Sequence, residues 1–170
     1  MAPRRLVVVR HAKAEPYAAT DHVRELTDRG RRDALAAGEY LRSIGVVPDH
    51  AVVSTSARTK QTWELVAAGA GAGGEAVYDD AVYAGSPDVV LEALRTVPEA
   101  TTVLAYVGHN PTVSYLAHLV EDGTAEPEPL QEMMGGFPPG SVAVFEVAGP
   151  WAKLAEETGR LVAFRPGGKG

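Results

Sequence analysis

Short β-branched runs alternate with helix-patterned segments along most of this chain, and this alternation restricts the fold more than any other feature. Leu6–Val9 is a continuous apolar run, as expected for a strand that is buried on both faces. The segment from residue 27 to residue 44 then places apolar residues at helical spacing. Thr27 is suited to cap the start of that helix and Gly45 to end it. Strands and helices in alternation are typical of α/β proteins with a parallel sheet.

The same alternation continues through the rest of the chain. Further strands are expected at Ala51–Val53, Ala76–Tyr78, Thr102–Val107, Val142–Val147 and Leu161–Phe164, and further helices from about Ala57 to Ala68, from Ser86 and from Asn110. Two stretches rich in Gly or Pro, 69–74 and 121–140, are expected to be loops. We therefore predict a three-layer α/β/α fold with a mostly parallel central sheet, in one domain over residues 1–170 with a flexible tail at 164–170.

Composition excludes several kinds of chemistry. The 170 residues include no cysteine, which rules out disulfides, thiolate zinc sites and cysteine nucleophiles. The formal net charge of -6 argues against general binding of nucleic acid. No apolar run approaches the ~18 residues of a membrane span, and the first residues lack the pattern of a secretory signal. We expect a cytoplasmic protein that binds neither nucleic acid nor membrane.

Basic side chains follow three of the predicted strands at the point where each strand ends. Arg10 and His11 follow the first strand. Arg58 comes shortly after the second, and His109 and Asn110 follow the strand over 102–107. Ligands of open α/β sheets bind beyond the carboxyl ends of the strands, so these side chains are expected to share one crevice. Arginine forks match phosphate oxygens, and an imidazole is a competent nucleophile at neutral pH.

This constellation predicts a phosphate site with a histidine nucleophile. A metal ion held by His11 and His109 is an alternative, which the adjacent arginines disfavour because they would repel a cation. The other histidines, His22, His50 and His118, show no constellation and are expected to be structural or exposed. Basic residues also gather between Arg24 and Arg32 and acidic ones between Glu121 and Glu132, which we interpret as solvated faces, the basic one also being able to dock an acidic protein surface.

Three segments together resemble the signature of the histidine phosphatase superfamily. They are Arg10-His11-Ala12, Ser56–Thr62 and Gly108–Pro111, and they occur in the order that the family shows. The stretch from Asp21 to Gly30 resembles the loop and helix start of the small SixA-type phosphohistidine phosphatases. The resemblance extends from residue 5 to about residue 165 and implies a phosphoglycerate mutase-like fold.

The resemblance also implies roles for individual residues. His11 would attack phosphorus and carry a transient phosphoryl group, and Arg10 and Arg58 would clamp the phosphoryl oxygens. His109 would lie against the phosphate and stabilise the transition state. Two further residues are expected to bind substrate: Arg24 and Asn110. The resemblance implies no cofactor and no metal.

One expected group is missing from the sequence. Larger members of the superfamily use a glutamate or aspartate as general acid, whereas the corresponding region here offers only Asp79 and Asp80, which also suit a turn. Alkoxide leaving groups need a well-placed acid. Phosphohistidine departs as imidazole, whose conjugate acid has a pKa of about 6.5, and so needs less help. We therefore expect a phosphohydrolase that acts on phosphohistidine in a protein.

Several alternatives remain open at this point. The enzyme could be a small-molecule phosphomonoesterase, and less favourably a phosphoglycerate mutase, since the chain is short and the acid is missing. A non-catalytic module that binds phosphohistidine is the alternative from another class. The expected partner is a phosphorylated protein, for example a histidine phosphotransfer domain, or a small phosphorylated substrate. We expect a monomer.

Overall fold

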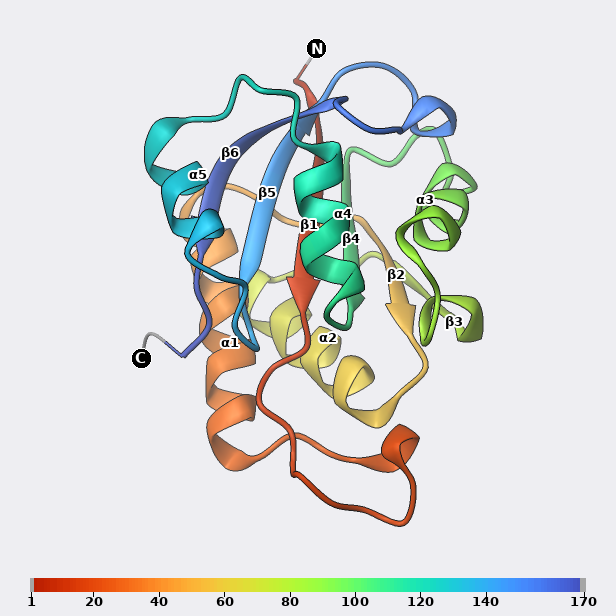
Figure 1. Cartoon of the computed structure of the whole chain (residues 1–170), viewed down its shortest axis with the longest axis vertical. Coiled ribbons are helices and arrows are strands. Elements are labelled where there is room, and N and C mark those ends of the chain that lie inside the picture. The colour runs from red at the N-terminus through yellow and green to blue at the C-terminus, as the bar shows by residue number, and fades with distance from the viewer. Residues whose placement is uncertain (1, 169–170) are drawn as a thin grey trace.

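The computed structural model describes residues 2–168, in which helices cover both faces of one six-stranded sheet (Figure 1). The strands are β1 (Arg4–Arg10), β2 (His50–Ser54), β3 (Glu75–Asp79), β4 (Val103–Gly108), β5 (Val142–Val147) and β6 (Gly159–Arg165). Their order across the sheet is β3-β2-β4-β1-β5-β6. The first four run parallel to one another, and β5 and β6 pair antiparallel. The predicted three-layer fold with a mostly parallel sheet is confirmed.

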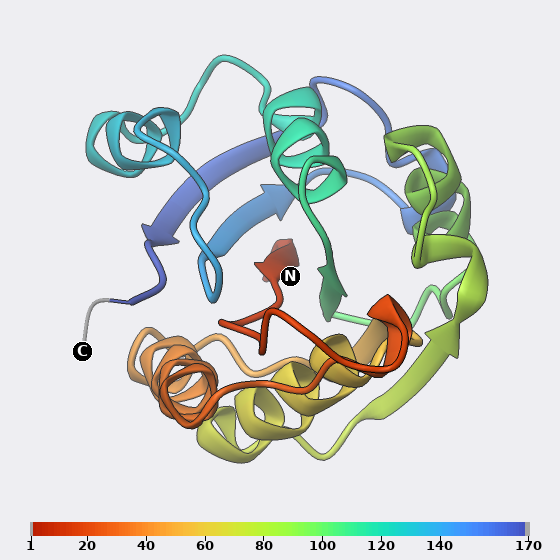
Figure 2. The ribbon, with the colours of Figure 1, turned by 60° about the horizontal axis from the view of Figure 1, so that its bottom comes forward.

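The helices divide between the two faces of the sheet. They are α1 (Asp28–Ser43), α2 (Ala57–Ala70), α3 (Pro87–Arg95), α4 (Thr112–Val120) and α5 (Pro127–Met134), with short 3-10 helices η1 (Asp21–Val23), η2 (Asp80–Val82) and η3 (Trp151–Lys153). Figure 2 shows α1 and α2 on one side of the sheet, and α3 and α4 on the other. The predicted helices therefore form, with bounds that differ by a few residues.

The central strand β1 explains why the sheet is covered on both faces. All four residues of its apolar run, Leu6–Val9, are fully buried. Side chains alternate along a strand, so Leu6 and Val8 enter one core cluster and Val7 and Val9 enter the other. The first cluster includes the apolar faces of α3 and α4, and the second includes those of α1 and α2. A run without polar residues thus requires a layer on each side.

Two glycines allow α1 and α2 to pack in close contact. A Cβ on Gly38 of α1 would lie 2.1 Å from the carbonyl oxygen of Val66, and one on Gly69 of α2 would lie 2.4 Å from that of Leu35. The expectation of a loop from residue 69 was therefore wrong at its start. Helix α2 continues through Ala70 because its glycine packs against α1, and Gly71, with φ of 71°, ends the helix.

The region 121–140 is not a continuous loop as predicted, because it contains α5. The two prolines of α5 made the segment look non-helical, yet Pro127 occupies the first helical position and Pro129 the first turn. Backbone N–H groups there have no intrahelical partner, so a proline costs little. Met133 of this helix is buried against the sheet core.

The expected flexible tail at 164–170 also differs from the structure. Strand β6 extends to Arg165, and the Phe164 side chain is only 6% exposed. Beyond the strand, the backbone N–H of Gly167 donates to Ser141 Oγ at 2.9 Å, and Arg29 donates to the carbonyl of Gly168 at 2.9 Å. Residues 169–170 lie outside the described residues.

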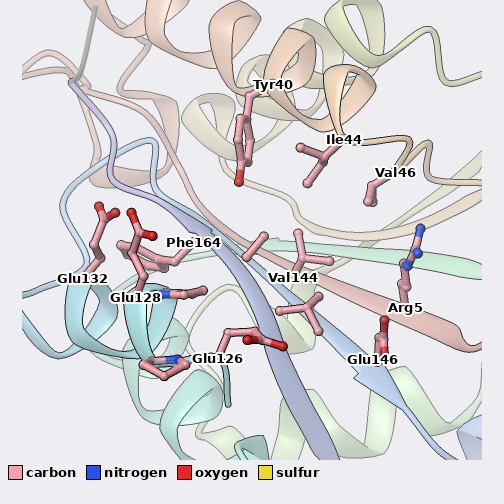
Figure 3. Close-up of a pocket in the computed structure, with 14 residues that line it drawn as sticks. Arg5, Tyr40, Ile44, Val46, Glu126, Glu128, Glu132, Val144, Glu146 and Phe164 are labelled. Atoms are coloured by element: carbon pink, nitrogen blue, oxygen red, sulfur yellow. The ribbon is translucent and has the colours of Figure 1, made fainter.

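A groove of about 850 Å³ opens between α1, α5 and the β5–β6 side of the sheet (Figure 3). Tyr40 projects into it from α1, and Glu128 and Glu132 line it from α5. Val144 and Phe164 contribute apolar side chains from the sheet. None of its lining residues is among those predicted for the phosphate site.

No helix within residues 2–168 is both long and apolar enough to cross a bilayer.

The carboxyl ends of β1, β2 and β4 meet at one edge of the sheet, where the long segment between β1 and α1 also lies (Figure 2). Two hydrogen bonds fix this segment to α2. The N–H of Ala12 donates to Thr62 Oγ1 at 3.0 Å, and the N–H of Leu26 donates to Gln61 Oε1 at 2.8 Å. The Thr27 hydroxyl then accepts from the N–H of Gly30 at 2.9 Å and begins α1, as the sequence predicted.

Candidate active site

His11 stands immediately beyond β1 with its ring orientation fixed by a backbone carbonyl. Its own N–H donates to the carbonyl of Gly108 at 3.0 Å, which places it beside the end of β4. Its Nδ1 lies 2.7 Å from the carbonyl oxygen of Ala12. A carbonyl only accepts, so Nδ1 carries the proton and Nε2 carries the lone pair. The ring is thus held in the tautomer in which Nε2 is the nucleophile.

Burial and nearby cations keep this imidazole neutral. Burial lowers the pKa of His11 to about 4, and the positive charges of Arg58, Arg10 and Arg24 act in the same direction, against the hydrogen bond to Ala12. A neutral imidazole keeps its lone pair at physiological pH. His11 therefore meets both requirements of a nucleophile, which are the correct tautomer and the unprotonated state.

His109 lies against His11, with ring centroids 5.4 Å apart. Its Nε2 is 2.7 Å from Ser54 Oγ, and its Nδ1 accepts from Arg58 Nη2 at 3.2 Å. Burial, followed by the charge of Arg58, lowers the pKa of His109 to about 3. The structure therefore brings the two predicted histidines together, and it adds Ser54, which the sequence analysis did not single out.

Arg58 is buried in the first turn of α2, with 5% of its surface exposed. Its Nη1 donates to the backbone carbonyl of Asp21 at 2.8 Å, and its Nη2 donates to the Asp21 carboxylate at 3.0 Å. The Thr62 hydroxyl donates to the Arg58 carbonyl at 2.7 Å and so links this turn to the segment after β1. The guanidinium is held from both sides and points into the site beside His109.

Arg10 and Asn110 share one anchor, the carbonyl of Phe137. Arg10 Nη1 donates to it at 3.0 Å, and Asn110 Nδ2 donates to it at 3.2 Å. Asn110 Oδ1 accepts from the N–H of Ser114 at 3.1 Å, so this side chain also supports the start of α4. Burial lowers the pKa of the Arg10 guanidinium. Asn110 thus serves the local structure of the site as well as lying at its edge.

Arg10 and Arg58 share one further feature. Within residues 2–168, their Nε–H groups are buried and have no hydrogen-bond partner, as is also the case for Arg5 outside the site. Both arginines are close enough to lower the pKa of His11. The region around His11 therefore suits an anion with several acceptor oxygens.

Asp21 links the predicted arginines and was not singled out by sequence reasoning. Its carboxylate is ion-paired with Arg24 at 3.0 Å and with Arg58 at 3.0 Å, and it accepts from the Tyr83 hydroxyl at 2.5 Å. The hydrogen bond from Tyr83, followed by those from both arginines, holds the pKa of Asp21 well below its usual range. The signal for it was its place in the Asp21–Gly30 segment.

Arg24 lies near the site but is held mainly by its own segment. Its Nε donates to Asp21 Oδ1 at 3.0 Å, and its Nη1 donates to the carbonyl of Glu15 at 2.8 Å. Its positive charge nevertheless helps to lower the pKa of both His11 and His109. The structure therefore places Arg24 at the rim of the pocket.

His22 has structural contacts, as the sequence allowed, but it makes them within a cluster that the sequence did not indicate. Its Nε2 lies 3.0 Å from Thr55 Oγ1, and that hydroxyl donates to the Asp80 carboxylate. The His22 ring also packs edge-on against Tyr83, with centroids 4.8 Å apart. Tyr83 in turn packs against His109 at 5.5 Å. The sequence held no local signal for this cluster, because three separate loops assemble it.

The remaining polar residues have structural roles. Asp79 Oδ1 accepts from the N–H of Ala81 at 2.9 Å and so caps η2. His50 is buried in β2 and His118 is exposed on α4, as expected. No three His, Asp or Glu side chains within residues 2–168 gather in a way that could hold a metal ion.

The comparisons with known proteins agree with this geometry. The family model described as histidine phosphatase superfamily (branch 1) matches residues 6–82. The uncharacterized protein Rv1276c of Mycobacterium tuberculosis is 35% identical over 158 residues, which are 92% of this chain and 98% of that protein. An uncharacterized protein of Mycobacterium leprae, ML1117, is 32% identical over 92% of this chain and 98% of its own length.

Solved structures extend the likeness over the whole fold. The SixA structure from Nakamurella multipartitia is 32% identical, with a TM-score of 0.87 over 99% of this chain and 98% of that chain. The SixA structure from Agrobacterium tumefaciens is 26% identical, with a TM-score of 0.78 over 97% of this chain and 99% of that chain. The two histidines and two arginines of the signature segments lie in one region of this fold. The chain belongs to the histidine phosphatase superfamily and has the phosphoglycerate mutase-like fold of its SixA-type members.

Proposed function

We propose that this chain is a phosphohydrolase that removes a phosphoryl group from phosphohistidine in a protein, through a covalent intermediate on His11. The observation that carries the proposal is the state of the His11 ring. Its Nδ1 proton is held by the Ala12 carbonyl, which leaves the Nε2 lone pair available near the positive charges of Arg58 and Arg10. A lone pair and a phosphate clamp in one place suit phosphoryl transfer.

The transfer would proceed in two displacements. In the first, His11 Nε2 attacks phosphorus, and the bond from phosphorus to the substrate nitrogen breaks with its electron pair going to the leaving ring. Arg10 and Arg58 donate to the phosphoryl oxygens as the charge on them redistributes. In the second, water attacks phosphorus and the electron pair of the broken P–N bond returns to Nε2. Because His11 keeps its Nδ1 proton throughout, it departs as neutral imidazole.

The carboxylates near the site support a nitrogen-linked substrate. Asp21 has a pKa well below its usual range, because it is hydrogen-bonded to Tyr83 and paired with arginines, so it stays ionised. Asp79 caps η2, and Asp80 accepts from Thr55. A phosphate ester with a basic alkoxide leaving group needs a protonated acid at the bridging oxygen. Phosphohistidine, which leaves as imidazole, does not need an acid at that position.

The rim of the site suits a protein-borne substrate. The Tyr17 side chain, in the segment between β1 and α1, is 88% exposed, and Val23 in η1 is 48% exposed. Both lie in the segment that also carries Asp21 and Arg24, and aromatic side chains are enriched where proteins contact one another. This supports a phosphorylated protein, for example a histidine phosphotransfer domain, as the partner.

The assay that tests the proposal compares two substrates with and without chelator. Wild type and His11→Ala are incubated with a phosphohistidine protein and with p-nitrophenyl phosphate, and released phosphate is measured. We expect chelator-resistant turnover of phosphohistidine that disappears in the variant. Turnover of small phosphates alone would instead indicate a small-molecule phosphomonoesterase. Binding of the phosphoprotein without turnover would indicate a binding module.

A further inference from the structure

We infer that His22 protonates the leaving imidazole when a phosphohistidine substrate gives up its phosphoryl group, an inference that rests on the function proposed above. His22 lies in η1, and its Nε2 is 3.0 Å from Thr55 Oγ1, whose hydroxyl donates to Asp80. A hydroxyl has one proton to donate, so Thr55 must accept from Nε2–H of His22. The hydrogen bonds from His22 to Thr55 and from Thr55 to Asp80 therefore orient the His22 ring. Nδ1 is the ring nitrogen that is not bonded to Thr55.

A series of aromatic rings places His22 relative to the nucleophile. The rings of His11 and His109 are 5.4 Å apart, those of His109 and Tyr83 are 5.5 Å apart, and those of Tyr83 and His22 are 4.8 Å apart. His22 is thus separated from the nucleophile by two intervening rings, those of His109 and Tyr83. In the proposed reaction the leaving imidazole extends from phosphorus toward these rings.

This outer position fits the chemistry of phosphohistidine better than that of an ester. An acid that assists an ester must reach the bridging oxygen, which is bonded directly to phosphorus. Phosphohistidine leaves as a neutral ring only when its far nitrogen takes up a proton, and that nitrogen lies across the width of the imidazole from phosphorus. The acid for phosphohistidine must therefore stand one ring further from phosphorus, and this is the role assigned to His22.

The other titratable groups around His22 are not suited to this role. Asp80 accepts from Thr55, and Asp21 is ionised because Tyr83 and the arginines hold its pKa well below the usual range. The hydrogen bond to Asp21 raises the pKa of the Tyr83 hydroxyl. The remaining neighbours are permanent cations: Arg24 and Arg58. Histidine is the side chain type that exchanges a proton near neutral pH.

The proton balance closes over the two displacements. In the first, His22 as imidazolium gives its Nδ1 proton to the far nitrogen of the substrate ring while the P–N electron pair moves to the near nitrogen. The leaving ring is then neutral imidazole. In the second, water attacks phosphorus, its oxygen forms the new P–O bond, and the P–N electron pair returns to His11 Nε2 as inorganic phosphate leaves. The surplus proton of that water passes to solvent, and His22 Nδ1 regains a proton from solvent, which restores the imidazolium.

The test compares how one substitution affects two leaving groups. His22→Gln retains an N–H that can donate to Thr55, but it cannot transfer a proton. Its kcat/KM is measured near neutral pH, where a histidine side chain can exchange a proton, on a phosphohistidine protein and on p-nitrophenyl phosphate, whose nitrophenolate leaves without a proton. We expect a loss of about 100-fold on phosphohistidine and a much smaller loss on the aryl ester, in line with the general-acid contribution of about 10²–10⁴-fold. His118→Gln, on the exposed face of α4, is the matched control.

Chemical rescue gives a second readout that a structural role would not produce. In His22→Ala, added imidazole is expected to restore part of the turnover of phosphohistidine, because it occupies the vacated space as a proton donor. Equal losses on both substrates with no rescue would overturn the inference and leave His22 a structural residue. A wild type that does not hydrolyse phosphohistidine at all would instead contradict the proposed function.

Discussion

Nη2 of Arg58 lies 3.2 Å from Nδ1 of His109. A guanidinium nitrogen only donates, so His109 accepts at Nδ1 and carries its proton on Nε2, toward Ser54 Oγ at 2.7 Å. The same Nη2 also donates to the Asp21 carboxylate at 3.0 Å. One arginine nitrogen therefore sets the tautomer of the second histidine and also ties η1 to the first turn of α2.

Arg58→Lys is expected to lower kcat/KM by about 10²–10³-fold, which is the usual cost of removing a donor that stabilises developing charge. Lysine keeps the charge, but it lacks the planar fork that reaches Asp21 and His109 together. Steady-state kinetics on a phosphohistidine protein would measure the loss. Arg32→Lys, on the exposed side of α1, is the control and should behave as wild type.

Stability is expected to fall as the pH is lowered through a window set by the two site histidines. The pKa of His11 is about 4 and that of His109 is about 3, against about 6.5 for histidine in an unfolded chain. Between these values the unfolded state binds more protons, so the free energy of unfolding increases with pH. This contribution should be complete above about pH 6.5 and be lost on acidification toward pH 4 and 3.

Urea denaturation at a series of pH values would check this slope. The double substitution of His11 and His109 by Gln should flatten the profile between pH about 6.5 and about 4. His118→Gln, at an exposed position, should leave the profile as it is in the wild type. A wild-type profile that is already flat in this window would show that the site histidines are not held neutral.

Gly38→Ala is expected to destabilise the fold by about 1–3 kcal/mol, the usual cost of overpacking. The new Cβ would meet the carbonyl oxygen of Val66 at 2.1 Å, so α1 and α2 would have to separate. Thermal or urea unfolding would measure the change. Gly73→Ala offers a matched control, because a Cβ there meets nothing within 4 Å.

Thr62→Val is expected to affect both stability and activity. The fully buried hydroxyl accepts from the N–H of Ala12 and donates to the carbonyl of Arg58. Removing it leaves a buried donor unsatisfied, which costs about 1–3 kcal/mol. Because the Ala12 carbonyl orients His11, we also expect kcat to fall. Thr96→Val, at an exposed helix end, should change neither quantity appreciably.

The regular elements could be predicted because their patterns are local. The run Leu6–Val9 specified a strand covered on both faces, and the Thr27 cap specified the start of α1. Helix α5 was missed because Pro127 and Pro129 suggest a loop, although both occupy first-turn positions where a proline is tolerated. The end of α2 was misplaced because only its contact with α1 explains why Gly69 is helical.

The same distinction applies to the site. His11, Arg58 and His109 could be placed together because each follows a strand whose carboxyl end meets the others. Asp21 and His22 could not be, since their positions depend on how η1 and η2 fold against one another. Three-residue 3-10 helices have no periodic pattern from which such contacts follow.

The most direct test of the central claim is to trap the phosphoryl group on the protein. Wild type is mixed with a phosphohistidine protein, quenched in alkali within the first turnover, digested and mapped by mass spectrometry. A bound phosphoryl group adds about 80 Da to one residue. We predict that this added mass is found on His11, is lost in acid and is absent from His11→Ala. A phosphoryl group on another residue, or turnover that persists in His11→Ala, would contradict the account.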